Sequence, residues 1–188
     1  MASAAELVSV PLLLDPKTVE QHSLRRKEPR WLRDARLAAV ERFTPESWPT
    51  GQEEEWRRFP LKELPEGSLV STLDSLPGIQ FKLEPQAAAQ GVIFKGLLRA
   101  SLDNPDLVRP HIAPGDGIPS HAAFRSIADA LWSAGSTFVH VPADVVVEMP
   151  IVVDKVWPAG GDAMLSRTIV VAERGSTVTI VEDLSSAG

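Results

Sequence analysis

Hydrophobic and polar residues follow two different periods along the chain. Between residues 30 and 43, apolar side chains recur at three- and four-residue spacing, which places them on one face of a helix. A similar pattern predicts a helix over residues 18–27 and another that begins after Ser120, whose hydroxyl can cap the first turn. The chain before residue 131 is therefore predicted to be mainly helical. The apolar face of residues 30–43 consists of Leu32, Ala35, Ala39 and Phe43.

Strand-like patterns replace the helical ones after Gly135. Residues 137–141 and 145–148 are rich in valine and flank a short turn, and residues 168–172 and 177–181 repeat this arrangement. The two turns lie about 31 residues apart, and such a repeat favours successive coils of a β-solenoid. An ordinary hairpin sandwich gives a similar local pattern, so periodicity leaves both folds open.

Shorter elements are predicted between these regions. Residues 91–94 have the composition of a brief strand, and Asn104 followed by Pro105 opens a short helix that runs to Val108. Residues 157–161 are rich in proline and glycine and are predicted to form an insertion between the two strand units.

Composition narrows the classes of protein that the chain can belong to. With 44% hydrophobic residues among 188, it can build a globular core. The absence of cysteine excludes disulfides, thiolate metal sites and cysteine-bound iron–sulfur clusters within these residues. A net charge of -6 gives no general attraction to nucleic acid or anionic lipid, so neither is expected as a partner. The apolar run over residues 7–14 is too short for an export signal or a membrane span, and we expect a cytoplasmic protein.

Candidate catalytic and ligand residues are few. The chain lacks a phosphate-binding loop that ends in Lys-Ser or Lys-Thr, and it lacks the Gly-x-Ser-x-Gly motif of esterases. The histidines lie far apart, which is typical of surface or turn positions, and alternation predicts that His140 faces solvent on its strand. We therefore assign no catalytic, cofactor-binding or metal-binding residue. The histidines are His22, His111, His121 and His140.

Two charged clusters are interpreted as solvated surface. The adjacent carboxylates of residues 53–55 are typical of a solvated turn. A basic strip on the first two helices is interspersed with acidic residues, which indicates an exposed and ion-paired surface rather than a phosphate-binding one. The strip consists of Arg25, Arg26, Lys27, Arg30, Arg33 and Arg36.

Several stretches occur in an order that is typical of one protein family. They are Glu28-Pro29-Arg30-Trp31-Leu32, Glu54-Glu55-Trp56-Arg57, Gly91-Val92-Ile93-Phe94, the segment from Ala130 to Pro142, and Arg167 to Val171 followed by Val181-Glu182-Asp183. Together they resemble the SufB/SufD family of iron–sulfur cluster assembly proteins. The resemblance is stronger to SufD, because SufB usually has a cysteine soon after the glutamate that corresponds to Glu182.

The resemblance implies an α+β fold with a defined order of domains. A flexible N-terminus (residues 1–17) precedes a mainly helical domain with short strands (residues 18–130). The first coils of a right-handed parallel β-helix follow over residues 131–188. Full-length members of the family are more than twice as long as this chain, so the β-helix is expected to be incomplete at Gly188. The residues that handle iron or sulfide are expected beyond that point.

The resemblance also implies a function. It indicates a non-enzymatic scaffold subunit that pairs with a SufB-like paralogue and binds a SufC-like ABC ATPase. This segment is expected to bind no cofactor, and an iron–sulfur cluster is implied only for the full assembly complex. Because an incomplete last coil leaves strand edges unpaired, we expect the chain on its own to self-associate.

Two other functions remain open at this stage. One is a carbohydrate-active β-helix enzyme, which needs convergent acidic residues and aromatic platforms for sugars. The other is a stand-alone adaptor, whose helical region before Pro49 binds a partner protein.

Overall fold

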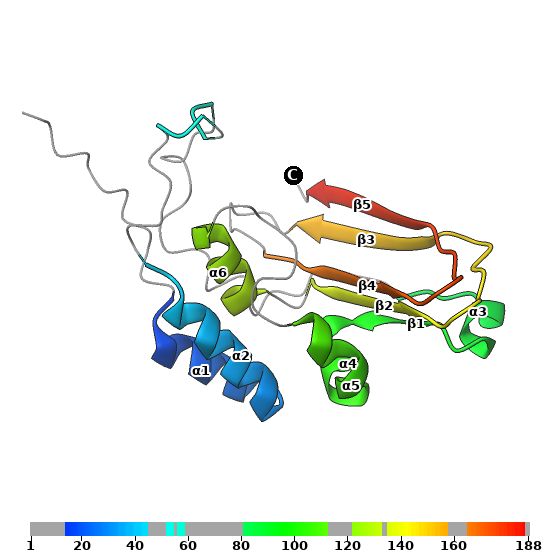
Figure 1. Ribbon diagram of the computed structural model, residues 1–188, viewed down its shortest axis with the longest axis horizontal. Coiled ribbons are helices and arrows are strands. Elements are labelled where there is room, and N and C mark those ends of the chain that lie inside the picture. Colours follow the sequence, from blue (N-terminus) through cyan, green and yellow to red (C-terminus); the bar gives the residue numbers. More distant parts are fainter. Residues whose placement is uncertain are drawn as a thin grey trace, which may run out of the picture.

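A helical group and two small sheets make up the part of the chain that the structure describes (Figure 1). The computed structural model describes residues 14–44, 52–54, 56–58, 81–112, 122–132, 135–157 and 165–186. Helix α2 (Arg30–Glu41) packs against α1 (Pro16–Arg25) and α6 (Ala122–Leu131). Their shared core contains Val19, Ala39, Val40, Ile127, Ala130 and Leu131.

Local signals explain where the first two helices begin. The Asp15 carboxylate accepts hydrogen bonds from the Thr18 backbone N–H at 3.0 Å and from the Thr18 hydroxyl at 2.9 Å, so it caps α1. Pro16 occupies the first turn, where its missing N–H costs nothing. The extended backbone of Pro29 then separates α1 from α2. These two helices therefore begin where capping and proline chemistry place them.

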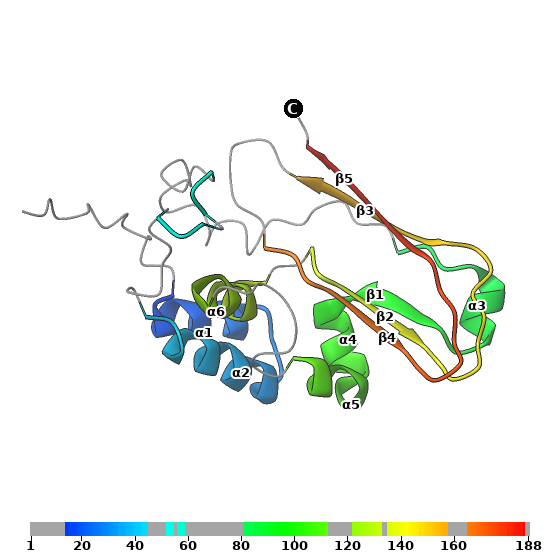
Figure 2. The ribbon, with the colours of Figure 1, turned by 45° about the horizontal axis from the view of Figure 1, so that its top comes forward.

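Short helices cover one face of the larger sheet. Helices α4 (Leu97–Asp103) and α5 (Pro105–Val108), with the 3-10 helix η4 (Arg109–His111), lie beside β1 (Ile93–Gly96), as Figure 2 shows. Their buried side chains meet those of α2 and of the sheet, which joins the helical group to the strands. This core contains Leu32, Leu97, Ala100, Val108, Ile112, Trp132, Phe138 and Ile169.

The strands form one three-stranded and one two-stranded sheet. Strand β2 (Thr137–Val141) pairs antiparallel with β1 and parallel with β4 (Thr168–Ala172). Strand β3 (Ile151–Trp157) pairs parallel with β5 (Ile180–Ser186). From β2 onward, strands that follow each other in the chain lie in different sheets. We call β2, the following turn and β3 the first unit, and β4, the following turn and β5 the second unit. Each strand of the first unit pairs with the matching strand of the second.

The turns that join the sheets stack on each other. The Asp144 N–H donates to the Arg174 carbonyl at 3.0 Å, and the Thr177 N–H donates to the Val145 carbonyl at 2.9 Å. Asp144 and Gly175 hold equivalent positions and both have left-handed backbones, with φ of 61° and 74°. The left-handed backbone favours glycine at position 175, while a Cβ there would meet the exposed Asp144 carboxylate, which can move aside.

The spacing between paired residues changes within the first unit. Thr137 pairs with Thr168, a spacing of 31 residues, and the bridge between Val146 and Thr177 keeps it. From Ile151, which pairs with Ile180, the spacing is 29 residues (151 to 180). Two additional residues are therefore accommodated between the turn and β3 in the first unit, where Met149 is 59% exposed.

The observed elements correct several sequence-based predictions. The predicted strand over residues 145–148 is reduced to the bridge at Val146, and the strand predicted from Thr177 begins at Ile180. Four described elements were missed, namely β3, α4, the 3-10 helix η4 and the short helix α3 (Pro85–Ala89) beside the turns (Figure 1). Prolines and short apolar runs hid these elements, because such patterns also occur in loops.

Other predictions were close or remain untested. The helices predicted over residues 18–27 and 30–43 are α1 and α2, with ends that differ by two residues. Ser120 and most of the insertion predicted over residues 157–161 lie outside the described residues. The β-helix and the two boundaries between the three predicted segments stay predictions. Strand β1, from the predicted helical domain, nevertheless shares a sheet with β2 across the predicted boundary at residue 131.

Candidate functional site

The space between the two sheets is apolar at the turn end and polar at the opposite end. Near the turns, Val139 and Val141 of β2 pack against Ile151 and Val153 of β3. Because strand side chains alternate, Lys155 points to the same side as Ile151 and Val153. The burial of β3 alternates accordingly, and Lys155 is only 2% exposed. Lys155 thus occupies the inward-facing position that follows Ile151 and Val153 on β3.

The Lys155 ammonium group contacts oxygens from three residues. Its Nζ lies 2.8 Å from Glu182 Oε1, 2.9 Å from Thr168 Oγ1 and 3.5 Å from Ser166 Oγ. A buried ammonium needs such partners, because desolvation without them costs several kcal/mol by order of magnitude. With three donors and three acceptors, the hydrogen-bonding capacity of Lys155 is filled.

Thr168 connects both sheets through its hydroxyl group. The hydroxyl accepts from Lys155 Nζ and from the Thr137 hydroxyl, whose Oγ1 lies 3.1 Å away. It donates its proton to Glu182 Oε1. One hydroxyl has one proton and two lone pairs, so Thr168 uses all of them. The Thr168 hydroxyl thus has all its hydrogen bonds formed and holds the polar side chains between the two sheets in one arrangement.

Glu182 is the open member of this polar network. Burial acts to raise the pKa of its carboxyl group, but the hydrogen bonds from Lys155 and Thr168 and the Lys155 charge outweigh it and lower the pKa. Its side chain is 37% exposed, whereas that of Lys155 is 3% exposed. The arrangement therefore holds an ionised carboxylate at the accessible side of a buried cation.

A second buried cation lies in the helical group. Arg36 forms a two-pronged ion pair with Glu28, with Nε–Oε2 at 2.8 Å and Nη2–Oε1 at 3.0 Å. Its guanidinium also donates to the carbonyls of Ala130 and Trp132 at 2.8 Å and 3.2 Å. The guanidinium lies 3.9 Å from the centroid of the Trp132 ring, within the range of cation–π attraction. Burial lowers the Arg36 pKa, while the Glu28 charge acts to raise it.

Further ion pairs join α6 to the start of β4. Asp129 Oδ1 lies 3.0 Å from Arg167 Nη1, and Asp129 Oδ2 lies 3.0 Å from Arg42 Nη2. Burial raises the Asp129 pKa, and the two arginines offset this effect in part. The Arg167 backbone N–H also donates to the Ser136 hydroxyl at 2.9 Å. These contacts fix the polar end of the sheets against the helical group.

Several curated proteins have sequences similar to that of this chain. An iron–sulfur cluster assembly protein SufB of Bacillus subtilis is 25% identical over 203 residues, which cover 90% of this chain. SufD of the same organism is 24% identical over 202 residues, which cover 93% of this chain. The chain is a relative of SufB and SufD. A SufBD family protein of Mycobacterium tuberculosis is 30% identical over 111 residues, or 58% of this chain and 13% of that protein. No family model matches the chain.

The comparison with SufB and SufD confirms the resemblance inferred from the sequence. The chain spans less than half of these relatives, 43% of the SufB and 46% of the SufD from Bacillus subtilis. The identities to SufB and SufD are nearly equal, so the predicted preference for SufD stays a prediction. Two of the stretches that carried the resemblance meet in space, because Arg36 links Glu28 to the carbonyl of Trp132.

The prediction for His140 was wrong. Its residue is 6% exposed, and its Nε2 lies 2.8 Å from Glu173 Oε1. The hydrogen bond from His140, together with one from the Ala143 N–H, lowers the Glu173 pKa. The face of β2 that was expected to meet solvent is covered. Phe138 on this face packs against helices, and Glu173 in the second turn contacts both His140 and the Ala143 N–H. Among the other histidines, His22 is buried, His111 is exposed and His121 lies outside the described residues.

The two charged clusters also differ in outcome. Glu53 and Glu54 are exposed, as predicted, and Glu54 pairs with Arg57 at 2.9 Å, whereas Glu55 lies outside the described residues. Trp56 stacks on Phe124 with ring centroids 4.9 Å apart. In the basic strip, the prediction of an exposed surface fails for Arg36, which is 3% exposed, and for Arg26, whose side chain is 10% exposed.

Sequence reasoning missed the polar interior altogether. Lys155 stands at an inward position of a strand, and Glu182 follows at an inward position of the strand that pairs with it. Recognising β3 as a strand would have exposed this signal. Within the described residues, no group of three or more histidine, cysteine, aspartate or glutamate side chains is arranged to hold a metal ion. No helix in the described ranges is long and apolar enough to cross a membrane.

Proposed function

We propose that the chain is part of a non-enzymatic scaffold subunit for iron–sulfur cluster assembly. The observation that carries this proposal is its similarity to SufB and SufD over 90% of its length or more. Both relatives are named as iron–sulfur cluster assembly proteins. Because the similarity extends over the helical group and both sheets, it supports a shared architecture rather than a shared motif.

The proposed architecture is a β-helix that begins at β2. Parallel pairing of β2 with β4 and of β3 with β5 supports it, as does the stacking of the two turns. Consecutive strands of a hairpin sandwich would pair with each other, whereas β2, β3, β4 and β5 alternate between the two sheets. A polar network inside the coils, built around Lys155, then fixes the separation of the two sheets.

The scaffold works in this proposal with a SufB-like paralogue and a SufC-like ATPase in the cytoplasm. This segment contributes a rigid platform and binds no cofactor itself. The cluster is assembled by residues elsewhere in the complex. Association through strand edges and flat faces is physically reasonable for stacked coils, because main-chain hydrogen bonds can extend from one protein to the next.

Co-expression of the full-length protein with these two partners tests the proposal. We expect the three proteins to purify as one complex, and we expect this complex to form a cluster from ferrous iron and sulfide, measured by visible absorption. As the control, the two partners are expressed without this protein and are expected to give less cluster. Failure of the protein to join either partner would contradict the scaffold role, and turnover of an acidic polysaccharide would favour the enzyme alternative.

A further inference from the structure

The two strands of the first unit differ in how their outer edges are protected. Strand β2 is flanked on one side by β4 and on the other by β1. Strand β3 pairs with β5, and no strand within the described ranges pairs with its other edge. Open edges expose main-chain donors and acceptors, and proteins usually cover them or use them for binding.

The register of β3 identifies which backbone groups are open. The Ile151 N–H donates to the Thr179 carbonyl at 2.9 Å, so this residue bonds toward β5. In a parallel pair, alternate residues bond toward the same neighbour. Val152, Asp154 and Val156 therefore direct their N–H and C=O groups away from β5, toward the uncovered edge.

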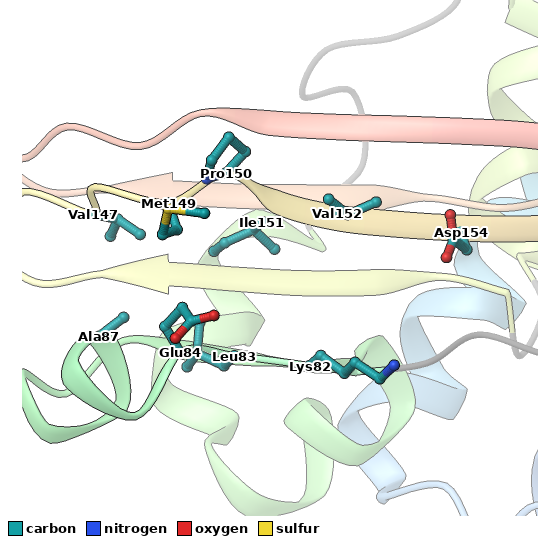
Figure 3. A pocket seen from close by; sticks show the side chains of 10 residues that line it. All are labelled: Lys82, Leu83, Glu84, Ala87, Val147, Met149, Pro150, Ile151, Val152 and Asp154. Atoms are coloured by element: carbon teal, nitrogen blue, oxygen red, sulfur yellow. The ribbon is translucent and has the colours of Figure 1, made fainter.

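A groove runs along this open edge (Figure 3). It has a volume of about 250 Å³ and adjoins a smaller hollow of about 70 Å³ that shares Glu84, Ala87, Val147 and Met149 with it. One wall is formed by residues 82–84 and Ala87, and the other by Val147, residues 149–152 and Asp154. We call this space the β3 groove. It owes part of its shape to Met149 and Pro150, which lie where the first unit accommodates its two additional residues.

The β3 groove combines apolar and acidic side chains. Ala87, Val147 and Ile151 are buried in its lining, while Met149 and Val152 are 59% and 45% exposed. The charged residues that line the groove and its adjoining hollow are Lys82, Glu84, Glu148 and Asp154, which gives an excess of negative charge. Asp183 stands beside Asp154 in register on β5 and adds to this excess. An occupant that carries positive charge and apolar side chains would complement the groove.

We infer that the β3 groove binds an extended basic segment of a partner protein, which adds as a strand to the open edge of β3. Main-chain hydrogen bonds to Val152, Asp154 and Val156 would hold the segment, as in other cases of strand addition. Alternate apolar side chains would enter the groove, and a lysine or arginine would lie near Asp154. This inference does not depend on the role in cluster assembly.

Charge distinguishes this occupant from a second copy of the chain. Pairing two copies edge to edge through β3 would bring two Asp154–Asp183 rows close together. Like charges opposite each other across strands are destabilising. A basic segment instead gains charge attraction at the same positions, which favours a heterologous partner over self-pairing.

Peptide binding to the full-length protein tests the inference. The probes are two eight-residue peptides that alternate valine and threonine and carry either arginine or glutamate at a central position. Affinity is measured by fluorescence anisotropy with the wild-type protein and with Asp154→Lys and Asp183→Lys. The two variants make the same charge change on the same outer face, but only Asp154 lines the groove. Amide hydrogen exchange reports on the β3 edge directly.

We expect the arginine peptide to bind at least about tenfold more tightly than the glutamate peptide. Asp154→Lys should weaken binding of the arginine peptide about fivefold or more, and Asp183→Lys less than about twofold, because its charge lies one strand farther away. The amides of Val152 and Asp154 should become protected when the peptide binds.

Four results would overturn the inference. The first is no binding of either peptide, and the second is an equal loss of affinity in both variants. The third is protection of the Val152 and Asp154 amides in the free protein at every concentration, which would mean that the chain itself covers the edge. The fourth is protection that grows with protein concentration, which would make a second copy the occupant.

Discussion

Two buried cations, Arg36 in the helical group and Lys155 between the sheets, are held in different ways. Arg36 meets Glu28, whose side chain is fully buried, and two backbone carbonyls close the site from the other side. Lys155 is as deeply buried, but its partner Glu182 is 37% exposed. The helical site is closed on all sides, whereas the site between the sheets remains open through its carboxylate.

This difference separates two uses of a buried charge. A closed pair can only hold elements together, since neither partner can exchange its contacts for others. An open pair leaves one partner able to contact water or another protein group, here through Glu182 Oε2, which forms no hydrogen bond with the described residues. We therefore expect the two sites to respond differently to the loss of the cation.

The largest effect is predicted for Arg36→Met. This substitution removes the two short contacts of the buried Glu28 carboxylate and leaves it only the longer one, 3.7 Å from Arg26 Nη1. Breaking a buried pair costs about 3–5 kcal/mol, and the remaining arginine places the expected loss at the lower end of this range. The free energy of unfolding should fall by this amount in urea titrations followed by tryptophan fluorescence. Trp132, which stacks on the guanidinium, makes fluorescence a local probe as well.

Arg30→Met provides the matched control for Arg36→Met. Arg30 lies on the same helix and pairs with Asp34 at 3.7 Å, but its side chain is 84% exposed. An exposed pair contributes about 0–1 kcal/mol, so the control should unfold almost as the wild type does. Equal destabilisation by both substitutions would show that the closed site has no special role.

A smaller effect is predicted for Lys155→Met. Water can reach Glu182 when the ammonium is removed, so the carboxylate is hydrated in the variant. The free energy of unfolding should therefore fall by about 1–3 kcal/mol. Lys155→Arg keeps the charge and should recover part of the loss. Unfolding in urea, followed by far-ultraviolet circular dichroism, measures both variants. A loss as large as that of Arg36→Met would mean that Glu182 is closed off as Glu28 is.

Thr168→Val probes the hydroxyl that connects the two sheets. The substitution preserves the shape of the side chain and removes one donor and two acceptors from the polar network. We expect the free energy of unfolding to fall by about 1 kcal/mol only, because Lys155 and Glu182 still contact each other. Thr177→Val is the control, since Thr177 is exposed outside the network. An unchanged stability of Thr168→Val would indicate that water replaces the hydroxyl.

The helices were largely predictable because their signals are local. Apolar spacing located α2, and Pro29 with the charged residues around it located its start. The strands were harder, because strand pairing joins residues about 31 positions apart and the sequence does not state which partner each strand chooses. The repeat of the turns was visible, but the two additional residues around Met149 and Pro150 hid β3 from a search for equal spacing.

The site was less predictable than the fold. Arg36 was assigned to an exposed basic strip, since helical periodicity does not reveal that α6 brings the carbonyls of Ala130 and Trp132 to that face. His140 was expected to face solvent because alternation identifies two faces but not what covers each of them. Burial of polar residues depends on tertiary contacts, which the local pattern does not contain.

The smallest predicted effect concerns the pH dependence of the open site. The pKa of Glu182 is lowered below its ordinary value of 4.5, so its ion pair stabilises the fold fully above that value. This contribution disappears as pH falls through the lowered pKa. Because Glu182 is partly exposed, the contribution of the ion pair should amount to less than about 1 kcal/mol.

Glu182→Gln should therefore be less stable than the wild type at pH 7 and should match it in strong acid, measured by thermal unfolding. The difference should shrink in the Lys155→Met background, since the hydrogen bond and the charge of Lys155 are then gone and only the Thr168 hydroxyl still lowers the pKa. A pH dependence of unchanged size in that background would mean that Lys155 does not contribute to it.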